Sequence, residues 1–330
     1  MTALKVRSCC GLIYSLVAVF VSCNQPFDPQ GAFNQRLVIF SILSTDRNVQ
    51  VVRVEQSYAP NGGDLLAYNM DNFVANAKVI LTGADSTMQL NDTTFARVDT
   101  TRFKYPLRAY ASRPYIPQYG SQYVISVQTD QFGTAGGKVT IPEKSHLAWG
   151  AGAEEVLNSP GSHQPGDAIP CYVLLSDIAK GYIARLFVDY SVYLGGQWVD
   201  QRAEVPVAFI YSGTKDFRWV TYAQLMRRPT THEFIQAYRN DIYAGTLINV
   251  SFDKYPTNKL VFKRIVYQFL QVEENLYNYY LLAHQFNDPR TLRLDQPDFT
   301  NVMGGVGVIG AYTLDSLTHT LPDVFVYNRR

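Results

Sequence analysis

Short runs in which apolar and polar residues alternate recur along most of the chain, and a period of two residues predicts β-strands. Residues 74–82 and 123–127 each place most of their apolar side chains on one face, and residues 37–43 form a continuous apolar run typical of a buried strand. Turn-forming Gly, Asn and Asp residues separate many of these runs. Strands this short and this regularly spaced favour an immunoglobulin-like antiparallel β-sandwich over residues 35–142.

The same alternation returns in the second half of the chain and predicts a second β-rich domain over residues 170–330. Residues 182–194 form its strongest strand pattern, and a Gly-Gly pair at 195–196 then leads into residues 198–207. Such a pair between two strands predicts a hairpin, because a tight primed turn needs positive φ at both central positions. Residues 143–169 contain repeated Gly and Pro with little periodicity, so we expect a linker or long loop there.

Helical periodicity is rare, and the chain is therefore expected to be mainly β with a few helices. The best helix pattern covers residues 273–287, where apolar side chains recur at helical spacing. Glu273 and Glu274 suit the positive N-terminal end of this helix, and an Asn-Asp-Pro sequence ends it. Its tyrosines could form a ligand platform, but packing of the helix on a sheet explains them more simply. Weaker patterns predict two further short helices, at 221–228 and 231–243.

The first 22 residues carry the features of a secretory signal peptide. Lys5 and Arg7 are the only charged residues before Asp28, and residues 11–22 form an apolar run of 12 residues. Such a run is too short to cross a bilayer as a helix, which needs about 20 residues, but it fits the apolar region of a signal peptide. We therefore expect residues 1–22 to be absent from the mature protein.

The residues at the end of this segment predict lipidation. Phe20 is too bulky for ordinary signal peptidase, which prefers small residues at the last and third-last positions before the cut. The order Phe-Val-Ser-Cys over residues 20–23 instead resembles a lipobox, in which a cysteine follows a small residue. That resemblance implies thioether lipidation of Cys23, with the alternative that Cys23 is an ordinary thiol beside the signal peptide. Residues 23–34 would then be the lipid anchor and a Pro-containing tether.

Composition narrows the classes of partner. Removal of residues 1–22 leaves 27 basic and 28 acidic residues, so the mature chain is almost neutral. A near-neutral chain without a basic cluster is a poor binder of nucleic acid, and nothing in it predicts electrostatic capture of anionic lipid. If Cys23 carries lipid, Cys171 has no partner and no internal disulfide is expected. Apolar residues make up 47% of the chain, so an extensive core can hold the fold instead.

No recognisable motif predicts a catalytic, cofactor or metal site. Residues 305–310 match the dinucleotide pattern GxGxxG, but that motif needs a strand-to-helix turn in a parallel βαβ unit, and the β-branched surroundings favour a tight strand or bulge. Cys171 is expected to be a buried structural thiol, and His232-Glu233 lacks the residues that complete a zinc site. A carboxylate pair for glycoside hydrolysis stays an alternative, drawn from four acids: Glu154, Glu155, Asp167 and Asp177.

Three segments resemble a known family when they are taken together. Residues 23–29 follow the lipobox, residues 123–127 lead through a glycine turn into 139–142, and residues 274–282 are followed by TNVMGGVGVIGAY over 300–312. This pattern resembles the Bacteroidetes envelope lipoproteins known as domain of unknown function 4249, across nearly the whole mature chain. The resemblance implies an accessory protein of TonB-dependent outer-membrane transporters, and it brings no catalytic residues.

The leading functional hypothesis is a non-catalytic outer-membrane lipoprotein without a cofactor. It would assist a TonB-dependent transporter or bind its cargo, on either the periplasmic or the surface side of the membrane. One alternative is a surface glycan-binding lipoprotein that uses some of its many aromatic side chains. The other is a hydrolase with an unrecognised carboxylate pair. An exposed row of Trp or Tyr would favour glycan binding, and a deep pocket with converging carboxylates would favour an enzyme.

Overall fold

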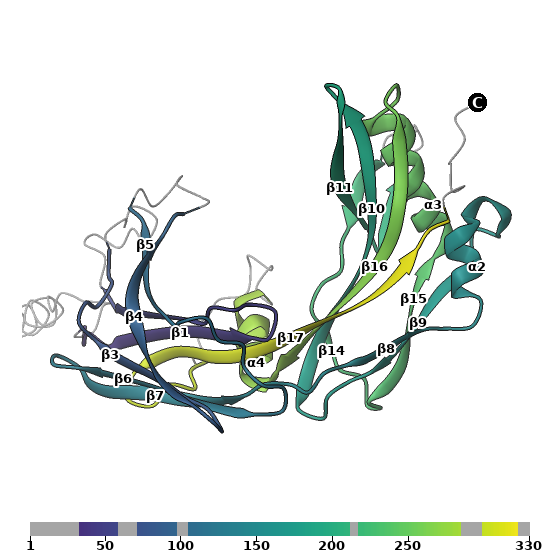
Figure 1. Cartoon of the computed structure of the whole chain (residues 1–330). Coiled ribbons are helices and arrows are strands. Elements are labelled where there is room, and N and C mark those ends of the chain that lie inside the picture. The colour runs from purple at the N-terminus through teal and green to yellow at the C-terminus, as the bar shows by residue number, and fades with distance from the viewer. Residues whose placement is uncertain (1–32, 59–70, 98–104, 212–216, 285–298, 323–330) are drawn as a thin grey trace, which may run out of the picture.

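The computed structural model describes residues 33–58, 71–97, 105–211, 217–284 and 299–322. Within these ranges the protein is mainly β with a few helices, as the alternating pattern predicts. Two lobes lie side by side and share one long strand (Figure 1). The expected signal peptide, Cys23 and most of the expected tether lie outside the described residues. No helix in the described ranges is long and apolar enough to cross a membrane.

Seven consecutive strands build the N-terminal lobe in the described residues. They are β1 (Leu37–Ser44), β2 (Val51–Gln56), β3 (Lys78–Thr82), β4 (Thr87–Phe95), β5 (Leu107–Ala111), β6 (Gln122–Thr129) and β7 (Gly133–Thr140). Strand β4 joins two facing layers, because its first residues pair with β3 and its last five pair with β5. The layers enclose a core of aliphatic side chains together with Tyr110 and Tyr123.

The C-terminal lobe combines three long strands with a smaller sheet and helices. The long strands are β10 (Ala179–Leu194), β11 (Gln197–Val205) and β16 (Leu260–Glu273). The smaller sheet contains β8 (His146–Trp149), β9 (Ala168–Leu174) and β15 (Glu233–Arg239). The helices are α2 (Ala153–Asn158), a 3-10 turn (Pro160–Ser162), α3 (Asn240–Ile248) with its π-helical continuation (Asn249–Lys254), and α4 (Glu274–His284). A separate hairpin contains β12 (Ala208–Tyr211) and β13 (Phe217–Thr221), and the short β14 (Met226–Arg227) pairs with β10.

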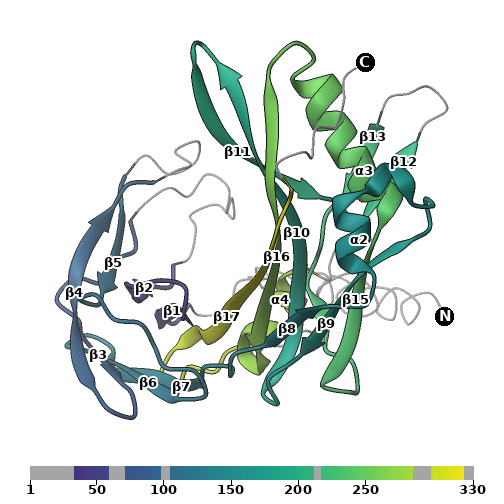
Figure 2. The same cartoon turned by 45° about the vertical axis from the view of Figure 1, so that its right-hand side comes forward.

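One face of the long strands forms the core of this lobe. Even-numbered side chains of β10, such as Leu186 and Val188, are fully buried against β9, β15, α2 and α3, which lie on the same side of the sheet (Figure 2). Gly195 and Gly196 connect β10 to β11 with φ values of 55° and 90°, which confirms the predicted hairpin.

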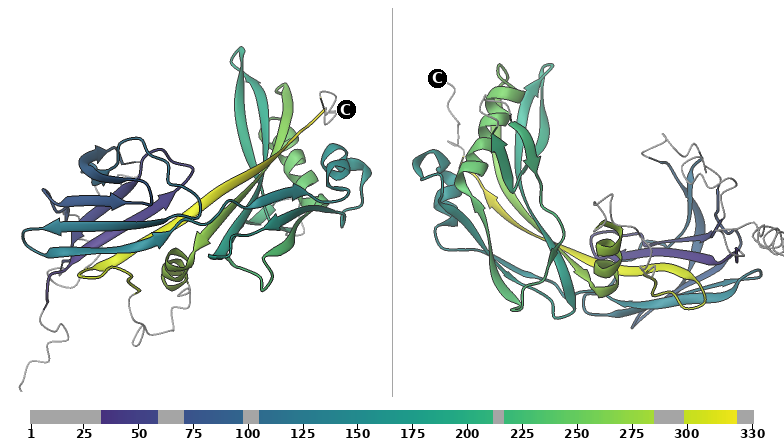
Figure 3. Two further views of the ribbon diagram at one scale, coloured as in Figure 1. Left: turned by 60° about the horizontal axis from the view of Figure 1, so that its bottom comes forward. Right: turned by 180° about the vertical axis from the view of Figure 1, so that it is seen from behind.

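The last strand, β17 (Val306–Thr320), belongs to both lobes. Its first half pairs in parallel with β1, and its second half pairs antiparallel with β16, so one large mixed sheet crosses the molecule (Figure 3). Ile309 and Ala311 lie in the N-terminal core, whereas Leu317 packs against the C-terminal core. The same face of one strand therefore serves two hydrophobic cores in succession.

Buried polar side chains separate the two cores. Gln271 is fully buried, accepts a hydrogen bond from the backbone N–H of Ser176 at 2.8 Å, and donates to Glu143 O and Thr313 Oγ1 at 3.0 and 3.2 Å. Nearby, Asp315 accepts hydrogen bonds from the backbone N–H and hydroxyl of Ser145 at 2.8 and 2.7 Å. These bonds attach the chain that leaves β7 to β16 and β17 at the junction between the lobes.

Several expectations from the sequence differ from the observed elements. Residues 143–169, expected as a linker or long loop, contain β8, α2 and the start of β9. The helix predicted at 231–243 is wrong for its first part, where β15 pairs with β9 before α3 begins. Residues 221–228 contain the short β14 and not a helix. Helix α3 buries six of its nine residues and has no continuous polar face. Its sequence therefore lacks the alternation of apolar and polar faces by which a surface helix is recognised.

Candidate binding site

Glycines allow the backbone of strand β7 to come into direct contact with the backbone of the segment before β17. Gly136 and Met303 exchange backbone hydrogen bonds of 3.0 and 2.8 Å. A Cβ atom on Gly137 would lie 2.6 Å from the carbonyl oxygen of Asn301, and one on Gly304 would lie 2.5 Å from that of Thr134. No side chain fits at either contact. We call Gly136, Gly137, Gly304, Gly305 and Gly307 together the glycine corner.

The GxGxxG sequence is part of this corner and has a structural role. Gly307 has a φ of 120°, and a Cβ atom there would lie 2.1 Å from the carbonyl oxygen of Ile39 on β1. All but the first of these residues lie in β17, which pairs with β1 and continues as a strand to Thr320 where the dinucleotide motif requires a helix. The expectation of a tight strand is therefore confirmed.

Asn301 and Glu273 complete the hydrogen bonding of β17 where β16 does not reach it. The Asn301 side-chain amide donates to Ile309 O at 2.7 Å and accepts from Ile309 N–H at 2.9 Å, as a neighbouring strand would. Two residues further on, Ala311 N–H donates to Glu273 Oε1 at 3.3 Å. On the edge of β17 that faces away from β1, side chains thus provide the hydrogen-bond partners of the backbone at Ile309 and Ala311. From Tyr312 onwards, β16 provides them, beginning with the pairing of Tyr312 and Val272.

Glu273 also caps the N-terminus of helix α4. Its carboxylate accepts hydrogen bonds from the backbone N–H groups of Asn275 and Leu276 at 2.7 and 2.8 Å, which are donors that a helix leaves unpaired. Burial raises the pKa of Glu273 to about 6, although these backbone donors act in the opposite direction. Gly310 lets the helix lie close to β17, because a Cβ there would be 2.8 Å from Leu276 Cβ.

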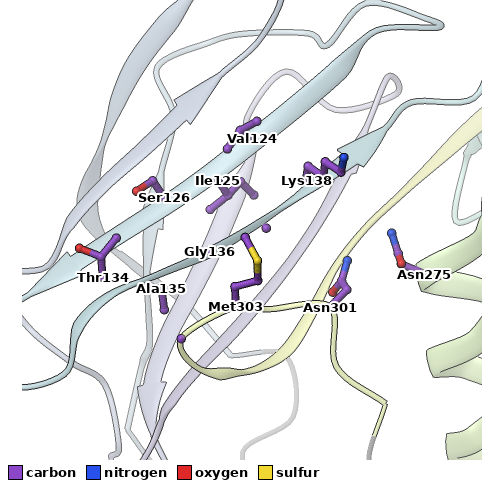
Figure 4. A pocket seen from close by; sticks show the side chains of 12 residues that line it. Val124, Ile125, Ser126, Thr134, Ala135, Gly136, Lys138, Asn275, Asn301 and Met303 are labelled. Atoms are coloured by element: carbon purple, nitrogen blue, oxygen red, sulfur yellow. The ribbon is translucent and has the colours of Figure 1, made fainter.

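A hollow of about 730 Å³ opens beside the glycine corner, and we call it the corner pocket. Figure 4 shows its lining, which comes from β6, β7, the start of α4 and the segment before β17. Met303 and Val124 are 79% and 43% exposed at this surface. Gly136 and Gly137 contribute only backbone to this lining in the middle of β7.

The chemistry of the corner pocket suits binding and not proton transfer. Among the described residues that line it, Lys138 is the one ionisable side chain; Ser126 and Thr134 supply hydroxyls, and Asn275 and Asn301 supply amides. Acid–base catalysis needs a positioned pair of titratable groups, and nucleophilic catalysis needs a base beside the nucleophile. An apolar hollow with a few polar groups at its margin is typical of a ligand or partner site.

The candidate residues from the sequence do not assemble into a site. Burial raises the pKa of the Cys171 thiol to about 12, and its side chain is buried in the C-terminal core, as predicted for a structural thiol. Asp167 pairs with His163 and Asp177 pairs with His232, while the remaining two acids are exposed on α2. Within the described ranges, no group of three or more His, Cys, Asp or Glu side chains could hold a metal.

The tyrosines of α4 mostly pack the helix onto the sheets. Tyr277 is largely buried, and its ring lies so close to Gly181 on β10 that a Cβ atom there would clash with it. Tyr279 makes an edge contact with Phe40 at a centroid distance of 5.9 Å. These contacts favour the packing interpretation over a ligand platform. No motif in the sequence predicts the corner pocket, and the paired glycines at 136–137 and 304–305 are the signal that could have revealed it. The pair at 136–137 was expected to turn the chain and instead lies within β7.

The structure thus defines a two-lobed β-protein whose last strand is shared and whose glycine-rich segment closes the first lobe. The chain belongs to the family described as a domain of unknown function (DUF4249), whose family profile matches residues 24–318. This match confirms the part of the resemblance that concerns domain of unknown function 4249. The segment that carried the resemblance most strongly, residues 300–312, is the one that forms the glycine corner and enters β17.

Other known proteins add little to this assignment. No curated protein matches the chain. Among solved structures, the C-terminal globular domain of an oligosaccharyltransferase from Pyrococcus abyssi is similar at 8% identity. The match covers 71% of this chain and 48% of that one, so the chain spans about half of that structure, and the TM-score is 0.20. A similarity of this size carries no argument about fold or function.

Proposed function

We propose that the mature protein is a non-catalytic lipoprotein of the outer membrane that binds a TonB-dependent transporter or its cargo. Cys23 would carry the lipid, and residues 24–34 would tether the fold to the membrane. The observation that carries the proposal is the corner pocket, because its lining offers apolar contact and hydrogen bonds but no pair of titratable groups.

The exposed side chains of the pocket match what a partner surface needs. Met adapts its shape to an incoming apolar group, and Met303 is the more exposed of the two apolar side chains at the rim. Lys138 and Asn275 can fix the orientation of a bound segment at the margin. A protein held at a membrane also meets its membrane partners at a high effective concentration, so a site of this modest size can be occupied.

Affinity purification from gently solubilised envelopes tests the partnership. The lipidated protein should recover a TonB-dependent receptor, and Met303→Glu should reduce that recovery several-fold because it places a charge in an apolar site. Met226→Glu is the matched control, since Met226 is 55% exposed on β14 in the other lobe. Repeated purification without any such receptor would contradict the transporter role.

Two further measurements test the remaining parts of the proposal. Mass spectrometry of the mature N-terminus should find acylated Cys23 as the first residue, and an unmodified Cys23 or a different cleavage site would contradict the anchor. Incubation of the purified protein with glycans and peptides should give no products. Turnover of either substrate class would overturn the non-catalytic part.

A further inference from the structure

The face of the long strands that points away from α3 carries an ordered set of charged and aromatic side chains. Cross-strand pairing places Arg202, Asp189 and Arg264 in one row across β11, β10 and β16. The next row towards the hairpin contains Asp200 and Ser191, with Lys263 beside them, and the tip carries Tyr193 opposite Trp198. We call these residues the charged face. A second hollow, of about 690 Å³, lies over its first two rows.

Asp189 holds both arginines of the first row in place. Its carboxylate accepts two hydrogen bonds from Arg202, at 2.6 and 2.9 Å, and one from Arg264 Nε at 2.8 Å. The side chain of Asp189 is only 12% exposed. Burial by itself acts to raise its pKa, but the two guanidinium groups prevail and hold the pKa below its ordinary value. Asp189 is therefore an anion at neutral pH and cannot act as a general acid.

The two guanidinium groups keep donors for a ligand. Arg202 contacts Asp189 through Nε and Nη2 and also lies over the ring of Phe187, which leaves Nη1. Arg264 uses only Nε towards Asp189, and its side chain is 54% exposed. A planar guanidinium that is already held by a carboxylate loses little freedom when it binds a second one. The row is thus prepared for an anionic group.

The hairpin tip supplies apolar contact next to these donors. Trp198 and Tyr193 are 51% and 39% exposed, with ring centroids 5.5 Å apart. Large aromatic rings with a polar edge are suited to ligands that have both apolar faces and hydroxyls. Trp198 and Arg202 are four residues apart on β11, which is about 13 Å along a strand. A ligand that contacts both is extended and longer than one ring.

We infer that the charged face binds an acidic saccharide, with its carboxylate on Arg202 and Arg264 and its sugar rings against Trp198 and Tyr193. The Asp200 carboxylate, the Ser191 hydroxyl and the Lys263 ammonium group would bind sugar hydroxyls between these two ends. The site is separate from the corner pocket, and the inference does not rest on the transporter partnership. Basic neighbours hold the pKa of both Asp189 and Asp200 below the ordinary value, so neither carboxyl supplies the general acid that glycoside hydrolysis needs.

Calorimetric titration of the purified mature protein tests the inference, with tetragalacturonic acid and the neutral maltotetraose as probes. The acidic tetrasaccharide should bind, should quench tryptophan fluorescence, and should lose affinity as salt rises. The neutral one should bind at least about tenfold more weakly. Equal binding of the two probes, or binding of neither, would overturn the inference. So would binding to anionic phosphatidylglycerol vesicles without binding to the acidic tetrasaccharide.

Variants locate the site. Arg264→Met and Trp198→Ala should each weaken binding of tetragalacturonic acid by about tenfold, since each removes one end of the contact. Arg239→Met is the control, because Arg239 is another exposed arginine paired with an aspartate, Asp241, and lies outside the charged face. Circular dichroism confirms folding of each variant. Unchanged affinity in both Arg264→Met and Trp198→Ala would place the ligand elsewhere and overturn the assignment.

Discussion

The corner pocket and the charged face enclose nearly the same volume, about 730 and 690 Å³, but are built in opposite ways. The corner pocket is lined by glycines at which distant segments of backbone come into contact. The charged face exists because paired side chains hold one another over an intact sheet. The first is therefore coupled to the fold, whereas the second can be altered with little effect on the fold. Substitutions at the glycine corner should therefore lower the stability of the protein, whereas substitutions on the charged face should change binding only.

The largest effect is expected from separating the N-terminal lobe from β17. A fragment of residues 33–142 lacks Val302, Ile309 and Ala311, which are buried in its core, and leaves β1 without one neighbour. We expect this fragment to be unfolded by circular dichroism and proton NMR. The same fragment with residues 299–312 joined by a flexible linker should regain a dispersed spectrum. Cooperative folding of the shorter fragment would show that the lobe does not need the shared strand.

Gly307→Val should destabilise the whole protein by about 3 to 5 kcal/mol, because it combines a positive φ with a contact to the backbone of β1. Chemical denaturation measures this change in the free energy of unfolding. Gly161→Val is the control, since Gly161 has open space around its Cα and no positive φ, and it should cost less than about 1 kcal/mol. Similar losses of stability in Gly307→Val and Gly161→Val would show that the glycine corner does not depend on glycine at position 307.

Glu273 should make stability depend on pH in a defined direction. Its folded pKa of about 6 lies above its ordinary value of 4.5, so the folded state binds the proton more tightly than the unfolded state. The resulting stabilisation is fully present below pH 4.5 and is lost as pH rises through 6, with a total of about 2 kcal/mol.

Glu273→Gln should flatten this part of the stability profile, because glutamine has no proton to release. Thermal unfolding of the variant and of the unchanged protein, at a series of pH values between 4 and 7.5, compares how the stability of each depends on pH. An identical slope in both proteins would assign the pH dependence to other groups.

The smallest effect is expected at the hairpin tip. Trp198→Ala should change the free energy of unfolding by less than about 0.5 kcal/mol, because half of the side chain is already exposed and its main contact is Tyr193. The same variant should weaken saccharide binding, which separates the charged face from the fold. A large loss of stability in denaturant titration would show that the tip supports the lobe.

Local patterns in the sequence predicted local features of the structure. Alternation identified the strands, the Gly-Gly pair at 195–196 identified the β10–β11 hairpin, and helical spacing identified α4 (Glu274–His284). The buried thiol of Cys171 was also predictable from its apolar neighbours. Each of these features is decided by residues that are close together in the chain.

The shared strand and both hollows could not be predicted in the same way. The parallel pairing of β1 with β17 joins residues near 40 to residues near 310, and no periodicity within either strand specifies that partner. The corner pocket depends on Gly136 and Gly137 meeting Asn301, which is again a contact between distant segments. The arginine row similarly needs three strands in register, although each of its residues occupies an ordinary polar position in its own strand.

Native-state hydrogen exchange tests the central claim, that β17 joins the two lobes into one folding unit. We expect the slowest amides of β1 and β6 in the N-terminal lobe to exchange with the same free energy as those of β10 and β16 in the C-terminal lobe, because both sets open only on global unfolding. Exchange from the N-terminal strands at a distinctly lower free energy would show that this lobe opens alone, and would contradict the claim.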